Sequence, residues 1–313
     1  MFQRILSVIL ILAGTATMAT GAEMFNYIPQ TADAAIYLRT EKLFSHPALR
    51  QLAGSGDISR IKEELTLIPW GLPDTIIPIF SQNRGYAMLV EYPLDIDRME
   101  AKLREYYRKN PAWVFTRGTK NGLSYLYLTR HRIKRSDKNY TLVFLAPGVI
   151  LMAGDKYPLS WEVLTGEYNR ELGARLQTIS AADLLFGYSP EPSKLGFDPM
   201  GISSRMKQFE FAVAAPASGK EILLRGEGNC AGPAVAVDCR EQLQNFKRIM
   251  LVTLFGADQN LFRSIDRTVT AEAEGAKVRF RAEFPQTILD AIRAYYESNS
   301  AQFSETLQHQ LKK

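Results

Sequence analysis

The chain of 313 residues is 46% hydrophobic and 23% charged, and its formal net charge is +5 at pH 7. This balance is typical of a packed globular protein and excludes a disordered chain, which would contain fewer hydrophobic residues. The small positive excess does not by itself indicate a nucleic-acid-binding protein. The length suffices for one large domain or two of ordinary size.

The first 22 residues have the three-part pattern of a secretory signal peptide. Arg4 supplies a positive start, Ile5 to Ala13 is almost wholly apolar, and small residues lead to Ala22. We expect cleavage after Ala22 and export of the mature chain, which would be periplasmic or secreted. The alternative is an uncleaved helix that anchors the protein to the inner membrane, since Ile5 to Thr20 approaches the roughly 20 apolar residues that span a bilayer. After signal removal the sequence predicts no transmembrane segment.

The predicted elements of the first half begin with a strand over Ala34 to Arg39, which leads into a helix at Thr40. Apolar residues at helical spacing between Ile58 and Ile68 predict another helix. A strand over Tyr86 to Tyr92 then precedes a helix capped by Asp95. The apolar side of that helix carries Ile96, Met99, Leu103 and one of Tyr106 and Tyr107.

Two hairpins complete this half. Trp113 to Arg117 and Leu123 to Thr129 alternate with a period of two on either side of Asn121-Gly122, a pair typical of a tight two-residue turn. Tyr140 to Ala146 and Val149 to Met152 form the second hairpin around a Pro-Gly pair. This order predicts a helix laid on an antiparallel sheet.

The second half repeats this scheme. Strands are predicted over Leu184 to Tyr188, Phe209 to Ala215 and Lys220 to Gly226, and a long helix opens at Pro233. A hairpin around Glu274-Gly275 and a last helix follow, built from Thr268 to Ala273, Lys277 to Ala282, and Ile288, Leu289, Ile292 and Tyr295. The sequence therefore predicts an α+β fold, with antiparallel sheets and helices packed on one face. The repeated order favours an internal duplication into modules at residues 23–178 and 179–313.

Four runs of the sequence resemble blocks of a known group of proteins. They are "FNYIPQTADAAIYLRTEKLFSHPALRQL", "RGYAMLVEYPLDIDRMEAKLREYY", "GVILMAGDKYPLSWEVLTGE" and "VRFRAEFPQTILDAI". These runs are similar to the spaced blocks of uncharacterised exported bacterial proteins with repeated α+β domains of unknown function. The resemblance implies a compartment and an architecture, and it implies no active site.

Cys230 and Cys239 are the only cysteines of the chain. In an oxidising compartment this closely spaced pair is a disulfide candidate, which would tie the end of a strand to the following helix. The alternative is two buried thiols, because Cys239 also falls in a helical apolar series with Val235, Leu243, Phe246, Met250 and Leu254. A redox-catalytic pair is disfavoured, because the spacing is not Cys-x-x-Cys.

Motifs for catalysis, metal binding and cofactor binding are not found in the sequence. His46, His131 and His309 lie in no motif that would place them beside a serine nucleophile or a second metal ligand. Gly54-Ser55-Gly56 and Gly226-Glu227-Gly228 lack the remaining residues of a phosphate loop and are interpreted as turns. Asp95 and Asp97 are interpreted as partners of the free N–H groups at a helix start. We therefore predict no catalytic residues, no metal and no cofactor.

Basic residues gather in the connection between the two hairpins of the first half. A solvated loop is the simplest interpretation, since connections are polar and exposed in most domains. The functional alternative is a contact for anionic lipid headgroups, acidic polysaccharide or an acidic protein face. The residues of this anionic-contact candidate are Arg130, Arg132, Lys134, Arg135 and Lys138.

The resulting hypothesis is an exported, non-catalytic protein of the cell envelope that acts by binding or by structural assembly. Its expected partners are an envelope protein, an anionic lipid surface or an acidic polysaccharide, and nucleic acid is not expected. One alternative is an envelope hydrolase whose site is assembled from distant residues. Another is a membrane-tethered subunit of a secretion or surface-appendage apparatus.

Overall fold

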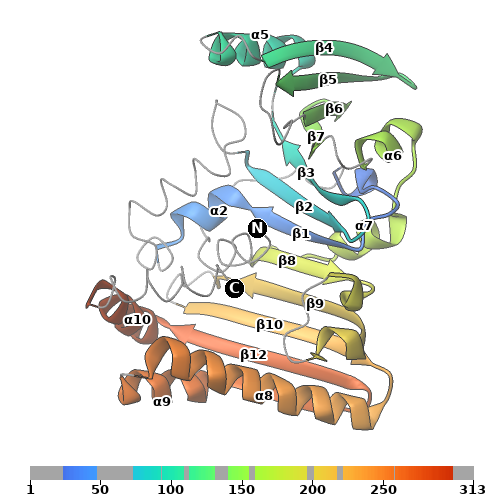
Figure 1. Ribbon diagram of the computed structural model, residues 1–313. Coiled ribbons are helices and arrows are strands. Elements are labelled where there is room, and N and C mark those ends of the chain that lie inside the picture. The colour runs from blue at the N-terminus through green and yellow to red at the C-terminus, as the bar shows by residue number, and fades with distance from the viewer. Residues whose placement is uncertain are drawn as a thin grey trace.

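A computed structural model describes residues 24–47, 73–92, 94–108, 113–130, 140–154, 159–195, 201–216, 221–256 and 258–298. Within these residues, twelve antiparallel strands form one sheet (Figure 1). The strands are β1 (Ala34–Arg39), β2 (Thr75–Ser81), β3 (Gly85–Glu91), β4 (Trp113–Lys120), β5 (Leu123–Arg130), β6 (Tyr140–Ala146), β7 (Val149–Gly154), β8 (Asp183–Ser189), β9 (Met206–Ala214), β10 (Glu221–Cys230), β11 (Val269–Glu274) and β12 (Lys277–Pro285).

The helices pack against this sheet. They are α2 (Thr40–Ser45), α5 (Ile96–Tyr107), α6 (Leu159–Thr165), α7 (Arg170–Leu176), α8 (Pro233–Phe255), α9 (Gln259–Thr268) and α10 (Gln286–Ser298), with the short 3-10 helices η1 (Met24–Tyr27), η2 (Pro192–Leu195) and η4 (Ser203–Arg205). The α+β class and the antiparallel pairing predicted from the sequence are confirmed.

The two halves of the chain occupy the two halves of the sheet. The strand order is β11-β12-β10-β9-β8-β1-β2-β3-β7-β6-β5-β4, and β1 and β8 join the halves, with Ala35 opposite Tyr188. Each half begins with three strands, β1 to β3 or β8 to β10, and continues with helix and then with further strands. The last strand of each half pairs with its third strand, β7 with β3 and β12 with β10. The two halves thus share a topology, while a duplication and a division into two domains remain predictions.

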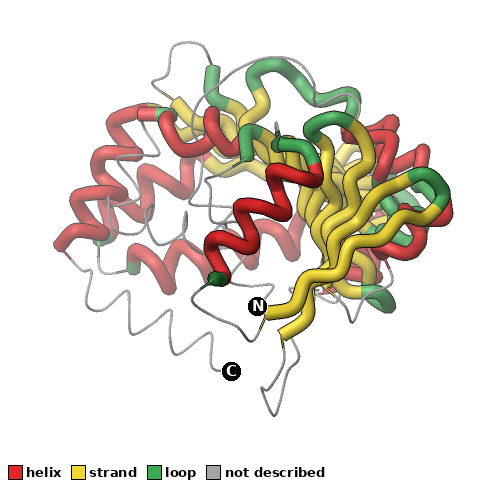
Figure 2. Tube along the Cα trace, turned by 90° about the horizontal axis from the view of Figure 1, so that it is seen from above, coloured by secondary structure: helices red, strands yellow, loops and turns green. Residues whose placement is uncertain are grey.

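Helices cover both faces of the first half of the sheet (Figures 1 and 2). Val90 and the buried residues of α5 belong to one apolar core, whereas the adjacent Leu89 and the buried residues of α6 and α7 belong to another. Neighbouring residues of a strand point to opposite faces, so these cores lie on opposite sides. The prediction that helices pack on only one face of the sheet therefore holds for β10, β11 and β12, which contact α8, α9 and α10. Strands such as β1 and β7 are apolar on both faces, and both faces must therefore be covered.

Local signals identified most elements at the correct place. Asp95 caps α5 by accepting a hydrogen bond from the backbone N–H of Arg98 over 2.8 Å. The turn between β4 and β5 has positive φ at Asn121 and Gly122, as a tight hairpin of this type requires. The strand β2 had no counterpart among the predicted elements, because Pro78 in its middle weakens a strand signal.

Two predictions about particular residues were wrong. Gly226-Glu227-Gly228 is not a turn but part of β10, where Phe280 and Met206 occupy the space that side chains at the two glycines would need. Met250 does not continue the buried side of α8, since 37% of it is exposed. The C-terminal part of α8 instead buries Leu251 and Phe255 in a cluster with α9 and α10, so its buried side is rotated relative to the apolar series.

Candidate functional site

One side of the second half of the sheet carries no helix over β10, β12 and β11 within the described residues. The helices α8, α9 and α10 contact these strands from the other side, where Val278 and Ala282 are buried. In the first half of the sheet, α6, α7 and η1 cover this same side. We call the uncovered part the open face and define it by Glu210, Ala212, Arg225, Glu227, Thr270, Glu272, Arg279 and Arg281.

Strand alternation and register place these side chains in two rows. Arg225 on β10 lies opposite Ala212 on one side and Arg281 on the other, and Thr270 on β11 follows Arg281. Two residues along the strands, Glu227 lies opposite Glu210 and Arg279, and Glu272 follows Arg279. Residues two apart in a strand point to the same side, so both rows share the open face. We call the first the basic row (Arg225, Arg281 and Thr270). We call the second the acidic row after its carboxylates (Glu210, Glu227 and Glu272), although Arg279 lies between Glu227 and Glu272.

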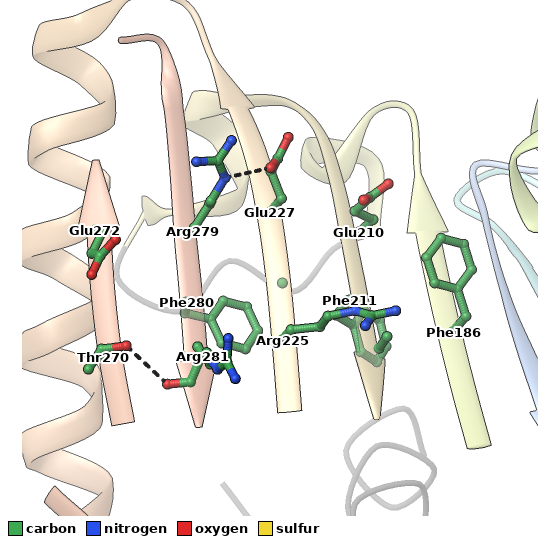
Figure 3. A pocket seen from close by; sticks show the side chains of 12 residues that line it. Phe186, Glu210, Phe211, Arg225, Glu227, Thr270, Glu272, Arg279, Phe280 and Arg281 are labelled. Carbon is green, nitrogen blue, oxygen red and sulfur yellow. Dashed lines mark hydrogen bonds and ion pairs between the residues drawn. The ribbon is translucent and has the colours of Figure 1, made fainter. Parts of the chain in front are cut away.

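The open face is hollowed by a cavity of about 410 Å³ (Figure 3). Phe186 on β8 and Ala212 contribute to the lining, together with the charged residues of both rows. The side chain of Arg225 extends from β10 across β9 toward β8, as Figure 3 shows. The cavity therefore combines the apolar side chains of Phe186 and Ala212, on β8 and β9, with guanidinium and carboxylate groups on β9, β10, β11 and β12.

Each arginine of the basic row has one carboxylate partner. Nη2 of Arg225 donates to both carboxylate oxygens of Asp183 over 2.9 Å, and only 1% of the Asp183 side chain is exposed. Burial raises the pKa of Asp183, while a backbone N–H from Ser180 and the charges of Arg225 and Arg39 oppose that rise. Arg281 pairs with Glu283, and 62% of its side chain is exposed.

In the acidic row the carboxylates differ in their partners. Hydrogen bonds from Arg279 and Lys277 lower the pKa of Glu227. Glu210 accepts a hydrogen bond from Nε of Arg175 on α7 over 2.8 Å. Glu272 has no hydrogen bond or ion pair with the described part of the chain and is exposed.

Like charges lie next to each other in both rows. Arg225 and Arg281 are direct cross-strand neighbours, and so are Glu210 and Glu227. Like charges in this position destabilise a sheet, and opposite charges stabilise it. The open face can therefore offer an anionic group the guanidinium groups of two neighbouring residues, Arg225 and Arg281. It can offer hydroxyl donors the carboxylates of the acidic row, in which Arg279 lies between Glu227 and Glu272.

A second cavity, of about 680 Å³, lies near the ends of β3 and β6. Asp74, Glu91 and Asp95 line it. Burial raises the pKa of Glu91, a hydrogen bond from Thr75 opposes this, and Asp74 adds to the rise. Asp95 already caps α5, so its carboxylate has a structural role. Groups of three or more His, Cys, Asp or Glu arranged to hold a metal ion are not found in the described ranges.

The residues singled out from the sequence lie elsewhere. Arg130 is the last residue of β5, and Arg132, Lys134, Arg135 and Lys138 lie outside the described residues. Cys230 ends β10 and Cys239 lies on α8, as expected, and both are buried and not joined by a disulfide bond in this structure. Burial raises the pKa of Cys230, and a hydrogen bond with Cys239 opposes the rise, so the two side chains are in contact.

Two other predictions concern histidines and glycines outside this face. His46 follows α2 and is buried, and burial lowers its pKa. His131, His309 and Gly54-Ser55-Gly56 lie outside the described residues.

The open face was not predicted from the sequence. Arg279, Arg281 and Glu283 alternate with Phe280 and Ala282, which signals a strand with one polar side. The pairing of Arg225 with Arg281 depends on strand register, and register does not follow from the alternation of one strand.

Comparison with protein-family models, curated proteins and solved structures finds no match to this chain. The resemblance to exported bacterial proteins therefore remains a prediction. Of the helices in the described ranges, none has both the length and the apolar character needed to cross a membrane.

Proposed function

We propose that the protein is exported to the cell envelope and acts there, without catalysis, by binding a partner on the open face. One observation carries this proposal. The open face is the broad side of β10, β12 and β11 that no described helix covers, and its charges form a basic row beside an acidic row. The signal-peptide pattern of residues 1–22 supports the location.

The chemistry of the open face favours a polar partner. A solvated sheet face needs only alternating polar residues, and cross-strand pairs of opposite charge would then stabilise it. Arg279 forms such pairs with Glu227 and Glu272. Arg225 faces Arg281, however, and Glu210 faces Glu227, and these like-charge pairs gain from a ligand with complementary groups. An envelope protein, an anionic lipid surface and an acidic polysaccharide are the partner classes that we propose.

The test uses the full chain with its signal peptide, expressed in a bacterial host with two membranes. A photoreactive residue replaces Thr270 on the open face, or Arg263 on α9 as a matched exposed position on the helical side. We expect a mature protein that begins at Glu23. We also expect a defined crosslinked species in the envelope fraction from position 270 and none from position 263.

Three results would contradict parts of this proposal. Recovery from the cytoplasm with Met1 in place would contradict export. Equal crosslinking from positions 263 and 270 would contradict binding on the open face. A membrane-bound form that retains Met1 would contradict cleavage and support the anchored alternative.

A further inference from the structure

We propose that the open face binds an acidic saccharide, with a carboxylate of the sugar held between Arg225 and Arg281 and hydroxyl groups directed at the acidic row. This inference rests on the proposed function and names its ligand class. It starts from Arg225 and Arg281, which are direct cross-strand neighbours and line the cavity of about 410 Å³. That volume lies in the range of small-molecule sites.

The two arginines retain donors for an anion. A guanidinium group has five N–H donors. Asp183 engages only Nη2 of Arg225, and Glu283 engages Nη2 of Arg281. Side chains at directly opposed positions lie about 5 Å apart at Cβ, so the two arginines leave the sheet side by side. Arg225 then extends across β9 toward Asp183, and a carboxylate held between the two arginines requires the exposed side chain of Arg281 to turn from Glu283 toward Arg225. Such charge-assisted bonds are the strongest kind that a polar ligand can form here.

The acidic row lies within the reach of the same sugar ring. It is displaced by two residues along the strands, which corresponds to about 7 Å. This displacement is comparable with the distance from the carboxylate of a hexuronic acid to the hydroxyl groups on the far side of its ring. Glu272, which has no partner within the described ranges, is free to accept from such a hydroxyl, and Thr270 can donate or accept beside it.

Other ligands satisfy only one of the rows. A simple anion would occupy the basic row and leave Glu272 of the acidic row without a donor. A cationic peptide would be attracted to Glu272 and repelled by Arg225 and Arg281. A neutral sugar would bond to the carboxylates and leave unused the arginine donors that Asp183 and Glu283 do not engage. An acidic sugar is complementary to both rows at once.

The test measures binding of trigalacturonic acid to the mature full chain by calorimetry. The comparison ligand is the trimethyl ester of the same trisaccharide, which keeps the hydroxyl groups and loses the charge. We expect at least tenfold weaker binding of the ester. We also expect binding of the acid to weaken as salt rises, because exposed charge contacts are screened.

Variants assign the site. Arg281→Gln removes an exposed guanidinium group, and we expect at least tenfold weaker binding of the acid. Arg263→Gln on α9 removes an exposed charge on the helical side, and its affinity should equal that of the parent. Because Arg225→Gln alone would leave the buried Asp183 without its partner, the variant to use is Asp183→Asn/Arg225→Gln, checked by its thermal midpoint.

The outcomes separate this inference from the proposed function. Equal affinity for the acid and the ester, or unchanged affinity in Arg281→Gln and in the double variant, would overturn the saccharide site. If the acid does not bind while position 270 still crosslinks in the envelope, the ligand class is wrong and the proposed function stands. If neither is observed, both are wrong.

Discussion

Asp183, at the start of β8, and Arg225, on β10, form an ion pair that crosses the intervening strand β9. Nη2 of Arg225 is 2.9 Å from each carboxylate oxygen. The Asp183 side chain is 1% exposed and that of Arg225 is 47% exposed, so the carboxylate is buried while the guanidinium group reaches solvent. The strand between them carries Ala212 at the position opposite Arg225, and this small side chain leaves room for the crossing.

We expect Arg225→Ala to destabilise the protein by about 1–3 kcal/mol, because it leaves a buried carboxylate with fewer partners. Urea unfolding followed by circular dichroism measures this change. The Asp183→Asn/Arg225→Gln variant removes both charges together and should lose less stability than Arg225→Ala. A larger loss in the double variant would show that the ion pair is not the reason.

A pH dependence follows from the pKa of Asp183, which burial raises. A carboxyl group with a raised pKa in the folded state binds its proton more tightly there than in the unfolded chain. Its contribution to the free energy of unfolding is therefore greatest below about pH 4, the ordinary value, and falls as pH rises through the folded value. We expect the stability of the parent relative to Asp183→Asn to decrease over this interval. An increase with pH would mean that Arg225 and Arg39 outweigh burial.

Gly226 provides a test of close packing on the helical side of the sheet. A methyl group there would meet the ring of Phe280. We expect Gly226→Ala to destabilise the protein by about 1–3 kcal/mol, as overpacking does. Adding Phe280→Leu should recover part of the loss, because the second change makes room for the first. Additive losses in a double-mutant cycle would argue against contact between the two positions.

Cys230 and Cys239 are expected to be bridged in protein recovered from an oxidising compartment. The contact between the two thiols agrees with a bridge between the end of β10 and α8. The bridge would stabilise the protein by about 2–3 kcal/mol. Thiol titration under denaturing, non-reducing conditions should find no free thiol after export. Two free thiols would support the alternative of a buried, reduced pair.

The basic connection around Arg132, Lys134 and Arg135 is expected to contact anionic surfaces. Neutralising all three should weaken binding to phosphatidylglycerol vesicles, since each basic residue near such a membrane contributes about 1 kcal/mol. The thermal midpoint should hardly change, because charges in a solvated connection, which the sequence predicts here, rarely alter stability by more than about 0.5 kcal/mol. Arg248→Gln on α8 is a control for loss of charge elsewhere. Unchanged vesicle binding in the triple variant would leave the connection a solvated loop.

The sequence by itself determined the local elements and their order. Asn121-Gly122 specifies a hairpin because both residues tolerate positive φ, and Asp95 starts a helix because its carboxylate accepts from a backbone N–H. The positions of Cys230 and Cys239 at a strand end and on the next helix also follow from local patterns.

Only the tertiary structure decided which strands are neighbours and which faces are covered. The joining of β1 to β8 in one sheet, and the pairing that sets Arg225 beside Arg281, depend on contacts between residues far apart in the chain. Alternation within a strand assigns side chains to two faces, and it does not tell which face a helix covers or which residue of another strand lies opposite. The open face arises from these two choices, and for this reason it was not visible in the sequence.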